Sequence, residues 1–124
     1  SGVPVTLALP EECVLPLRPD AMHRCLGNLI ANARRYGAHV WVTVIESNML
    51  VEVLVDDDGP GIPLGDREAV FRPFFRLDPS RNPETGGTGL GLAIARDVVR
   101  AHGGEIALVD SPHGGLRARV RLPK

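Results

Sequence analysis

The sequence predicts an α/β (α+β) fold in which about three helices cover one face of a mixed, mainly antiparallel sheet. Two pairs of segments alternate between apolar and polar residues around short turns, a pattern typical of β-hairpins. Other segments carry apolar residues at helical spacing, and the two kinds of segment are interspersed along the chain. Hairpins interspersed with helices favour a largely antiparallel sheet with one covered face.

The composition is that of one globular domain. The chain has 124 residues, of which 44% are hydrophobic and 23% charged. Its 14 Lys and Arg residues against 15 Asp and Glu residues give a net charge of −1, which provides no electrostatic footprint for nucleic acid. Cys13 and Cys25 form neither a disulfide framework nor a metal-ligand pattern, so we expect two reduced thiols. No apolar run approaches the length of a membrane span.

The strands of the N-terminal half are predicted from short apolar runs. Residues 5–10 and 13–18 are expected to be two strands around a Pro-Glu-Glu turn. Residues 39–46 and 49–57 alternate on either side of Ser47-Asn48 and predict a hairpin.

Residues 19–37 carry the clearest helical pattern. An apolar stripe is formed by Met22, Leu26, Leu29 and Ala33. Asp20 is a suitable N-cap, and Gly37 stands where a glycine commonly ends a helix.

The C-terminal half begins with an irregular stretch from Gly59 to about Gly89, with a short helix expected only near residues 67–70. The segment GGTGLGLAIARDVVRAHGG (86–104) opens with glycines and continues as a helix. Residues 105–110 and 116–123 are expected to be strands joined by a turn at 111–115.

Asn28, Asn32 and Arg35 share one stripe of the first helix, beside its apolar stripe. Amide oxygens can ligate Mg²⁺, and a guanidinium can bind phosphate. The alternative is a solvated helix face on which the asparagines are incidental. These residues alone leave both interpretations open.

The segment VDDDGPGIP (55–63) ends a strand in acids and turns on two glycines. A buried carboxylate there could accept a hydrogen bond from a ligand, with the glycines allowing a flat ring to approach closely. The alternative is that these residues only break the strand.

The glycines of residues 86–91 suggest either a flexible linker or an anion site at a helix N-terminus. The chain contains no Walker A pattern and no complete dinucleotide fingerprint. Its four histidines are scattered along the sequence at His23, His39, His102 and His113, which predicts no metal cluster.

Four segments in this order resemble the ATP-binding catalytic domain of bacterial sensor histidine kinases, most closely the osmosensor (EnvZ-type) kinases. This domain belongs to the superfamily of DNA gyrase, MutL and heat-shock chaperone ATPases. NLIANARRY (28–36) is similar to the N box and DDDGPGI (56–62) to the first glycine box. FRPFFR (71–76) is similar to the F box, and residues 86–104 are similar to the second glycine box. The resemblance covers essentially the whole chain, residues 1–124.

The resemblance implies a two-layer Bergerat-type sandwich that holds ATP and Mg²⁺ on its helical side. It assigns Asp57 to the adenine amino group, Asn32 to Mg²⁺, and a mobile ATP lid to about residues 76–89. The full nucleotide-binding set that it implies is Asn28, Asn32, Arg35, Tyr36, Asp57, Gly59, Gly61, Ile62, Phe74, Gly87, Thr88, Gly89, Leu90 and Gly91.

The resemblance also implies phosphoryl transfer to histidine. Members that hydrolyse ATP carry a glutamate where this chain has Asn28, and a neutral amide is a poor general base. An imidazole needs less activation than water, which fits transfer to histidine. The catalytic residues that the resemblance implies are Asn28, Arg35 and Arg81, and Arg76 is a further candidate phosphate contact.

No histidine of this chain precedes an acidic residue, as the family's phosphoacceptor does. We therefore expect the catalytic half of a kinase, whose substrate is a separate helical hairpin of the same protein and whose downstream partner is a response regulator. The expected location is the cytoplasmic part of an inner-membrane sensor, and the isolated domain is expected to be a monomer. A degenerate nucleotide-binding regulatory module, or a superfamily ATPase, is the alternative function.

Overall fold

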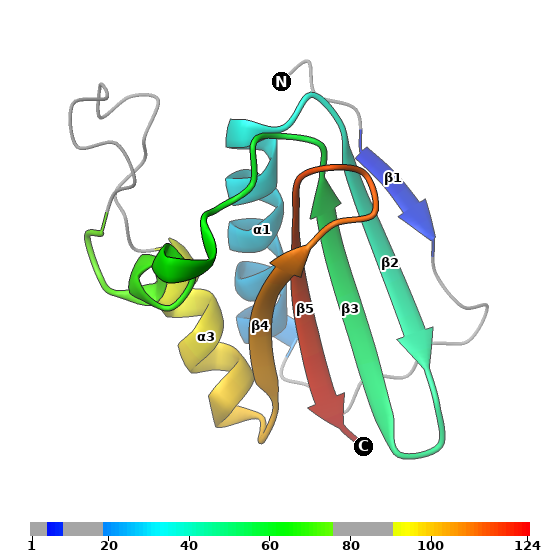
Figure 1. Ribbon diagram of the computed structural model, residues 1–124. Coiled ribbons are helices and arrows are strands. Elements are labelled where there is room, and N and C mark those ends of the chain that lie inside the picture. The colour runs from blue at the N-terminus through cyan, green and yellow to red at the C-terminus, as the bar shows by residue number, and fades with distance from the viewer. Residues whose placement is uncertain (1–4, 9–18, 76–90) are drawn as a thin grey trace.

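The computed structural model describes residues 5–8, 19–75 and 91–124, in which five strands form one sheet (Figure 1). The strands are β1 (Val5–Ala8), β2 (Val40–Glu46), β3 (Leu50–Asp57), β4 (Glu105–Asp110) and β5 (Leu116–Pro123). Their order is β1-β2-β3-β5-β4, with β1 parallel to β2 and each other neighbouring pair antiparallel. The prediction of a mixed, mainly antiparallel sheet is confirmed.

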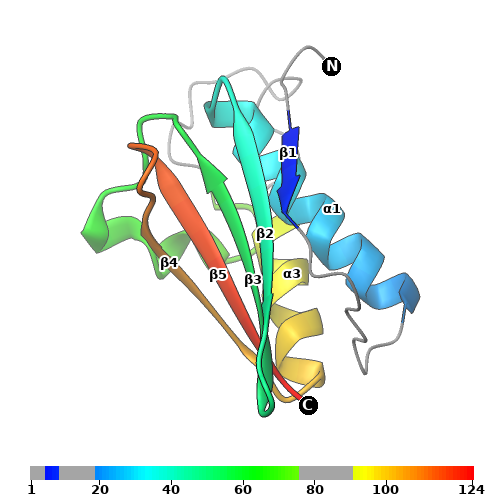
Figure 2. The ribbon, with the colours of Figure 1, turned by 90° about the vertical axis from the view of Figure 1, so that its right-hand side faces the viewer.

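Helices α1 (Pro19–Tyr36) and α3 (Gly91–Ala101) pack against each other on one face of the sheet, as Figure 2 shows. The other face of the sheet carries no helix of the described part of the chain. The fold is therefore a two-layer α/β arrangement with one covered face, as expected. Neither helix is long and apolar enough to cross a membrane.

The short helix expected near residues 67–70 is replaced by two 3-10 turns, Leu64–Asp66 and Ala69–Phe71. Closely spaced prolines and glycines leave too few consecutive residues for an α-helix to propagate. The second turn lies against α3, where the Arg96 guanidinium pairs with Glu68 at 2.6 Å and lies 4.4 Å from the ring centroid of Phe71.

The ends of α1 differ partly from the prediction. The helix begins at Pro19, so Asp20 lies inside its first turn and is not the N-cap residue. Proline suits a first helical position because its fixed φ is helical and its missing N–H needs no partner there. The helix ends at Tyr36 as predicted, and Gly37 donates its N–H to the Ala33 carbonyl at 2.9 Å.

The core lies between the sheet and the two helices. Cys25 of α1 and Ala95 and Val99 of α3 are fully buried where the helices meet. Burial raises the pKa of the Cys25 thiol to about 11, which makes it an unreactive core residue, in line with the predicted reduced thiol. Cys13 lies outside the described residues.

Both predicted hairpins are present. The β2–β3 turn is closed by hydrogen bonds between Ser47 and Leu50, whose backbone N–H reaches the Ser47 hydroxyl at 3.2 Å. The β4–β5 turn is closed by the Ser111 N–H, which donates to the Gly115 carbonyl at 2.9 Å. Of the two N-terminal strands that we predicted, the first is β1, and the second, at residues 13–18, lies outside the described residues.

Candidate functional site

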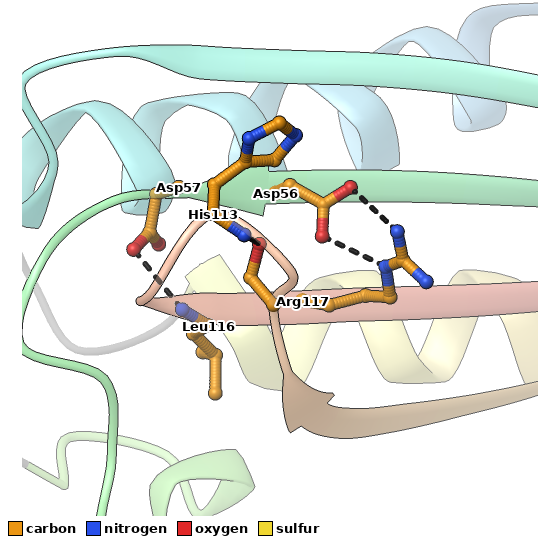
Figure 3. A network of polar contacts seen from close by, with 6 residues as sticks. Asp56, Asp57, His113, Leu116 and Arg117 are labelled. Atoms are coloured by element: carbon orange, nitrogen blue, oxygen red, sulfur yellow. Dashed lines mark hydrogen bonds and ion pairs between the residues drawn. The ribbon is translucent and has the colours of Figure 1, made fainter.

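Asp57, the last residue of β3, is a buried carboxylate with 3% of its surface exposed. Its Oδ1 accepts hydrogen bonds from the N–H groups of Gly59 at 2.9 Å and Leu116 at 3.2 Å; Figure 3 shows the second. Among the described residues no hydrogen-bond donor reaches Oδ2, so this oxygen keeps its lone pairs for a ligand. Burial raises the pKa of Asp57, and the two hydrogen bonds only partly oppose that effect.

Three glycines allow other segments to approach Asp57 closely. A Cβ on Gly115 would lie 2.2 Å from Asp57 Oδ1, and a Cβ on Gly37 would lie 2.8 Å from Asp57 Cβ. A Cβ on Gly59 would lie 2.5 Å from the Tyr36 carbonyl oxygen. The end of α1, the end of β3 and the β4–β5 turn therefore meet at this carboxylate without room for larger residues.

The neighbours of Asp57 have structural partners. Asp56 is 1% exposed and forms a two-point ion pair with Arg117 of β5, at 2.8 and 3.2 Å (Figure 3). Asp58 is exposed, and its Oδ1 accepts the backbone N–H groups of Ala38 at 2.8 Å and His39 at 3.0 Å. These bonds, the one from His39 first, lower the pKa of Asp58. Asp57 and Asp58 each keep a carboxylate oxygen without a described partner, but Asp57 is the buried one of the two, so its oxygen is the better candidate for recognising a ligand.

Asn28 contributes the second feature of the site, on the middle of α1. Its Nδ2 is buried and has no hydrogen-bond partner among the described residues. A Cβ on Gly91, the first residue of α3, would lie 3.8 Å from Asn28 Cβ, so this amide stands beside the start of the second helix. A buried donor without a partner is costly, so Asn28 Nδ2 is a candidate to bind an acceptor atom of a ligand.

The remaining polar residues of the α1 stripe are half-buried. Asn32 lies one turn after Asn28, and the Arg35 guanidinium lies 6.0 Å from the ring centroid of Tyr36. The eight residue steps from Asn28 to Tyr36 span about 12 Å of helix. The polar stripe of α1 thus runs from the Asn28 amide, beside the start of α3, to the end of the helix, where Gly37 packs against Asp57.

The other predicted site residues fall into three groups. Gly61 and Ile62 belong to the turn that follows Asp57 and Gly59 in the sequence. Gly61 adopts φ +74°, a left-handed conformation that favours glycine, and Ile62 is buried. Phe74 is 69% exposed, and no described contact brings it to Asp57 or Asn28. Outside the described residues lie Arg76, Arg81, Gly87, Thr88, Gly89 and Leu90.

Sequence reasoning missed Gly115 and Leu116, which it treated only as the end of a turn and the start of a strand. Their contact with Asp57 spans 59 positions of sequence, and no periodic pattern links them. The only available signal was the Gly114-Gly115 pair, because two glycines in a short turn can indicate close backbone packing.

With this geometry in view, similarity to known proteins decides the family. Residues 18–124 match the family described as histidine kinase-, DNA gyrase B-, and HSP90-like ATPase. The chain belongs to this family. The resemblance and the Bergerat-type fold predicted from the four sequence boxes are thereby confirmed.

Known members of the family with similar sequences are sensor histidine kinases. The chain is 44% identical over 109 residues to GtrS of Pseudomonas aeruginosa, covering 88% of this chain and 22% of that protein. It is 46% identical over 110 residues to CpxA of Escherichia coli, covering 85% of this chain and 23% of that protein. The chain thus spans less than a quarter of the length of these relatives.

Among solved structures, the ATP-binding domain of PrrB from Mycobacterium tuberculosis superposes with a TM-score of 0.80. The two chains are 32% identical, and the match covers 99% of this chain and 81% of that one. The fold therefore corresponds to the catalytic ATPase part of histidine kinases.

Proposed function

We propose that this domain binds Mg·ATP and transfers the γ-phosphoryl group to a histidine on a helical hairpin of the same sensor kinase. The observation that carries the proposal is the Asp57 carboxylate, buried at the end of β3 with both described hydrogen bonds on one oxygen. In a family of ATPases, such an acceptor suits the amino group of adenine. A buried acceptor strongly rejects ligands that lack the matching donor.

In this proposal the phosphates lie along the second half of α1, beside Asn28 and Asn32. Asn32 would hold Mg²⁺ through its amide oxygen, because hard divalent cations prefer oxygen ligands, and Asn28 lies beside it one turn earlier. The atom of Asn28 that lacks a described partner is its buried Nδ2, a hydrogen-bond donor, and this supports a phosphate oxygen as its partner. When bound, Mg²⁺ neutralises charge on the phosphates.

Two further groups of the chain would hold the phosphates. Arg35 supplies a fixed positive charge, and the N–H groups of the first turn of α3, which have no partner within the helix, supply hydrogen-bond donors. Neither group can abstract a proton at neutral pH. The site therefore orients ATP and stabilises its charge, and it offers no activation to water.

The proposal distinguishes phosphotransfer from hydrolysis through Asn28. An amide does not act as a general base, so water at this position gains little nucleophilicity. A histidine of the hairpin brings its own nucleophilic nitrogen and needs only to be aligned with the γ-phosphate. Robust phosphate release by the domain alone would instead indicate a superfamily ATPase.

The partners of the proposed kinase are the hairpin that carries the phosphoacceptor histidine and a response regulator that receives the phosphoryl group. The sensor histidine kinases with similar sequences support both. We also propose that the domain works in the cytoplasm. The isolated domain is proposed to be a monomer, and sedimentation velocity can test this oligomeric state.

A chimera tests the activity most directly, with this chain replacing the corresponding domain of Escherichia coli CpxA. We expect ATP-dependent labelling of the chimera that is acid-labile and base-stable, as phosphohistidine is, and loss of labelling in the Asn32→Ala chimera. A folded chimera that binds ATP without becoming labelled would indicate a degenerate nucleotide-binding module. Phosphate release without labelling would indicate an ATPase.

A further inference from the structure

Trp41 lies between two imidazole rings on the face of the sheet that the helices leave open. The ring of His39 is stacked on it with a centroid distance of 4.2 Å and an interplanar angle of 22°. The ring of His113 is stacked on it at 3.6 Å and 6°. The three rings come from three segments: the residues after α1, strand β2 and the β4–β5 turn.

Both histidine-bearing segments also pack against Asp57. On one side, His39 lies two residues after Gly37, whose backbone packs against Asp57 Cβ. The His39 backbone N–H donates to Asp58 Oδ1 at 3.0 Å. On the other side, His113 precedes Gly115, which is in contact with Asp57 Oδ1. The ring stack therefore bridges, on the open face, the two segments that enclose the carboxylate.

The β4–β5 turn transmits the position of His113 to the hydrogen bond at Asp57. The backbone N–H of His113 donates to the Ser111 hydroxyl at 3.1 Å, and Gly114 N–H donates to the Ser111 carbonyl at 3.1 Å. With the Ser111–Gly115 bond, these contacts make the turn one closed unit. Fixing the His113 ring on Trp41 consequently restricts where the Leu116 N–H can lie.

We propose that the stack of His39, Trp41 and His113 is a positioning element for the nucleobase end of the site. It holds the β4–β5 turn and the end of α1 against Asp57. The orientation of the carboxylate, and with it the position of Oδ2 that would bind the base, is thereby fixed. In this proposal the three rings act through the backbone segments that meet Asp57, as positioning residues and not as ligands of the nucleotide. This inference rests on the proposed function for its effect on ATP, but its structural part can be measured without nucleotide.

The test compares His113→Ala with His113→Phe, which restores an aromatic ring, and with His23→Ala, which removes an exposed histidine of α1. Amide hydrogen exchange of Leu116 is followed by NMR without nucleotide, with the amide of buried Val53 as the monitor of global unfolding. Emission of Trp41, the only tryptophan, reports whether the stack is lost. Affinity for a non-hydrolysable ATP analogue is then measured by calorimetry.

We expect His113→Ala to speed Leu116 exchange and to weaken nucleotide binding, each by about two- to tenfold, the range that an aromatic pair is worth. His113→Phe should restore both values, and His23→Ala should change neither.

Unchanged Leu116 exchange in His113→Ala, with Trp41 emission showing that the stack is lost, would overturn the inference. So would faster exchange at Leu116 and Val53 alike, because that is general destabilisation. If the wild-type domain binds no nucleotide, the proposed function fails, while the Leu116 exchange still decides the role of the stack.

Discussion

Leu116 donates its backbone N–H to Oδ1 of Asp57 at 3.2 Å, although 59 positions separate the two residues. Asp57 is the last residue of β3 and Leu116 the first of the antiparallel strand β5. Beyond the last pair of the β3–β5 ladder, the Leu116 N–H thus finds its acceptor in a carboxylate oxygen of Asp57. The same bond fixes the carboxylate, so the second oxygen has one direction to offer a ligand. Sheet closure and ligand recognition depend on one side chain here.

Asp57→Asn separates these two roles. Asparagine keeps an oxygen for Gly59 and Leu116 but replaces the ligand acceptor by a donor. We expect affinity for ATP analogues to fall about 10- to 100-fold, the value of a charged hydrogen bond, with or without magnesium. Calorimetry checks this change, and unaltered affinity would remove Asp57 from the base site.

The same variant has a predicted pH dependence of stability. A raised pKa means that the ionised Asp57 is less favourable in the folded than in the unfolded chain. That cost is fully present above the raised pKa and disappears as the pH falls through the ordinary value of 3.8. Asp57→Asn should therefore melt at the same or a higher temperature than the wild type at pH 7, with the difference shrinking towards pH 4. A lower melting temperature at pH 7 would contradict this.

Asn32→Ala should weaken nucleotide binding only when magnesium is present. Even residues that merely orient a metal ligand are worth about tenfold in affinity, so we expect at least about that loss with Mg²⁺. Titrations with Mg²⁺ and with excess EDTA measure the difference. If Asn32→Ala and Asp57→Asn respond alike to magnesium, the assignment of Asn32 is wrong.

Gly115→Ala tests the close packing at Asp57. Its Cβ would lie 2.2 Å from Oδ1 and 2.5 Å from the Asp57 carbonyl oxygen, so we expect destabilisation by about 1–3 kcal/mol or more in urea unfolding. Gly27→Ala in α1 is the matched control, because no atom lies within 4 Å of its new Cβ. It should stabilise the domain by about 0.5–1 kcal/mol through helix propensity. Equal effects of the two changes would refute the packing argument.

Asp58→Ala should lower stability at neutral pH and much less in acid. An acid whose pKa is lowered by folding stabilises the fold above its unfolded value, and this contribution is lost as the pH falls through the folded value. The window therefore lies below the ordinary pKa of 3.8. Acid-unfolding curves of the variant and the wild type should converge there, and a constant separation at all pH values would exclude this role of Asp58.

Local patterns were sufficient for most of the fold. Alternation predicted the β2–β3 and β4–β5 hairpins, and helical spacing with Gly37 predicted the end of α1, because each signal lies within a few neighbouring residues. The errors were also local. Proline at position 19 suits the first residue of a helix, so α1 begins there and Asp20 lies inside its first turn. The stretch near residues 67–70 forms 3-10 turns instead of an α-helix.

The candidate site was predictable only where its residues share one segment. The stripe of Asn28, Asn32 and Arg35 follows from the geometry of one helix, whereas the choice of Asp57 among the three acids came from the family resemblance. The partners of Asp57 from β5 and the stack on Trp41 could not be predicted, because they depend on sheet order and on contacts between distant segments. Likewise, nothing local distinguishes Asp57 from Asp56, whose partner Arg117 lies in another strand.

The central claim, that Asp57 recognises the base of ATP in this domain, is tested most directly by one titration. A non-hydrolysable ATP analogue with Mg²⁺ is added to the wild-type chain and to Asp57→Asn in a calorimeter. The account predicts saturable one-to-one binding to the wild type that the variant largely loses while remaining folded. Equal binding to both proteins, or no binding to well-folded wild-type protein, would contradict it.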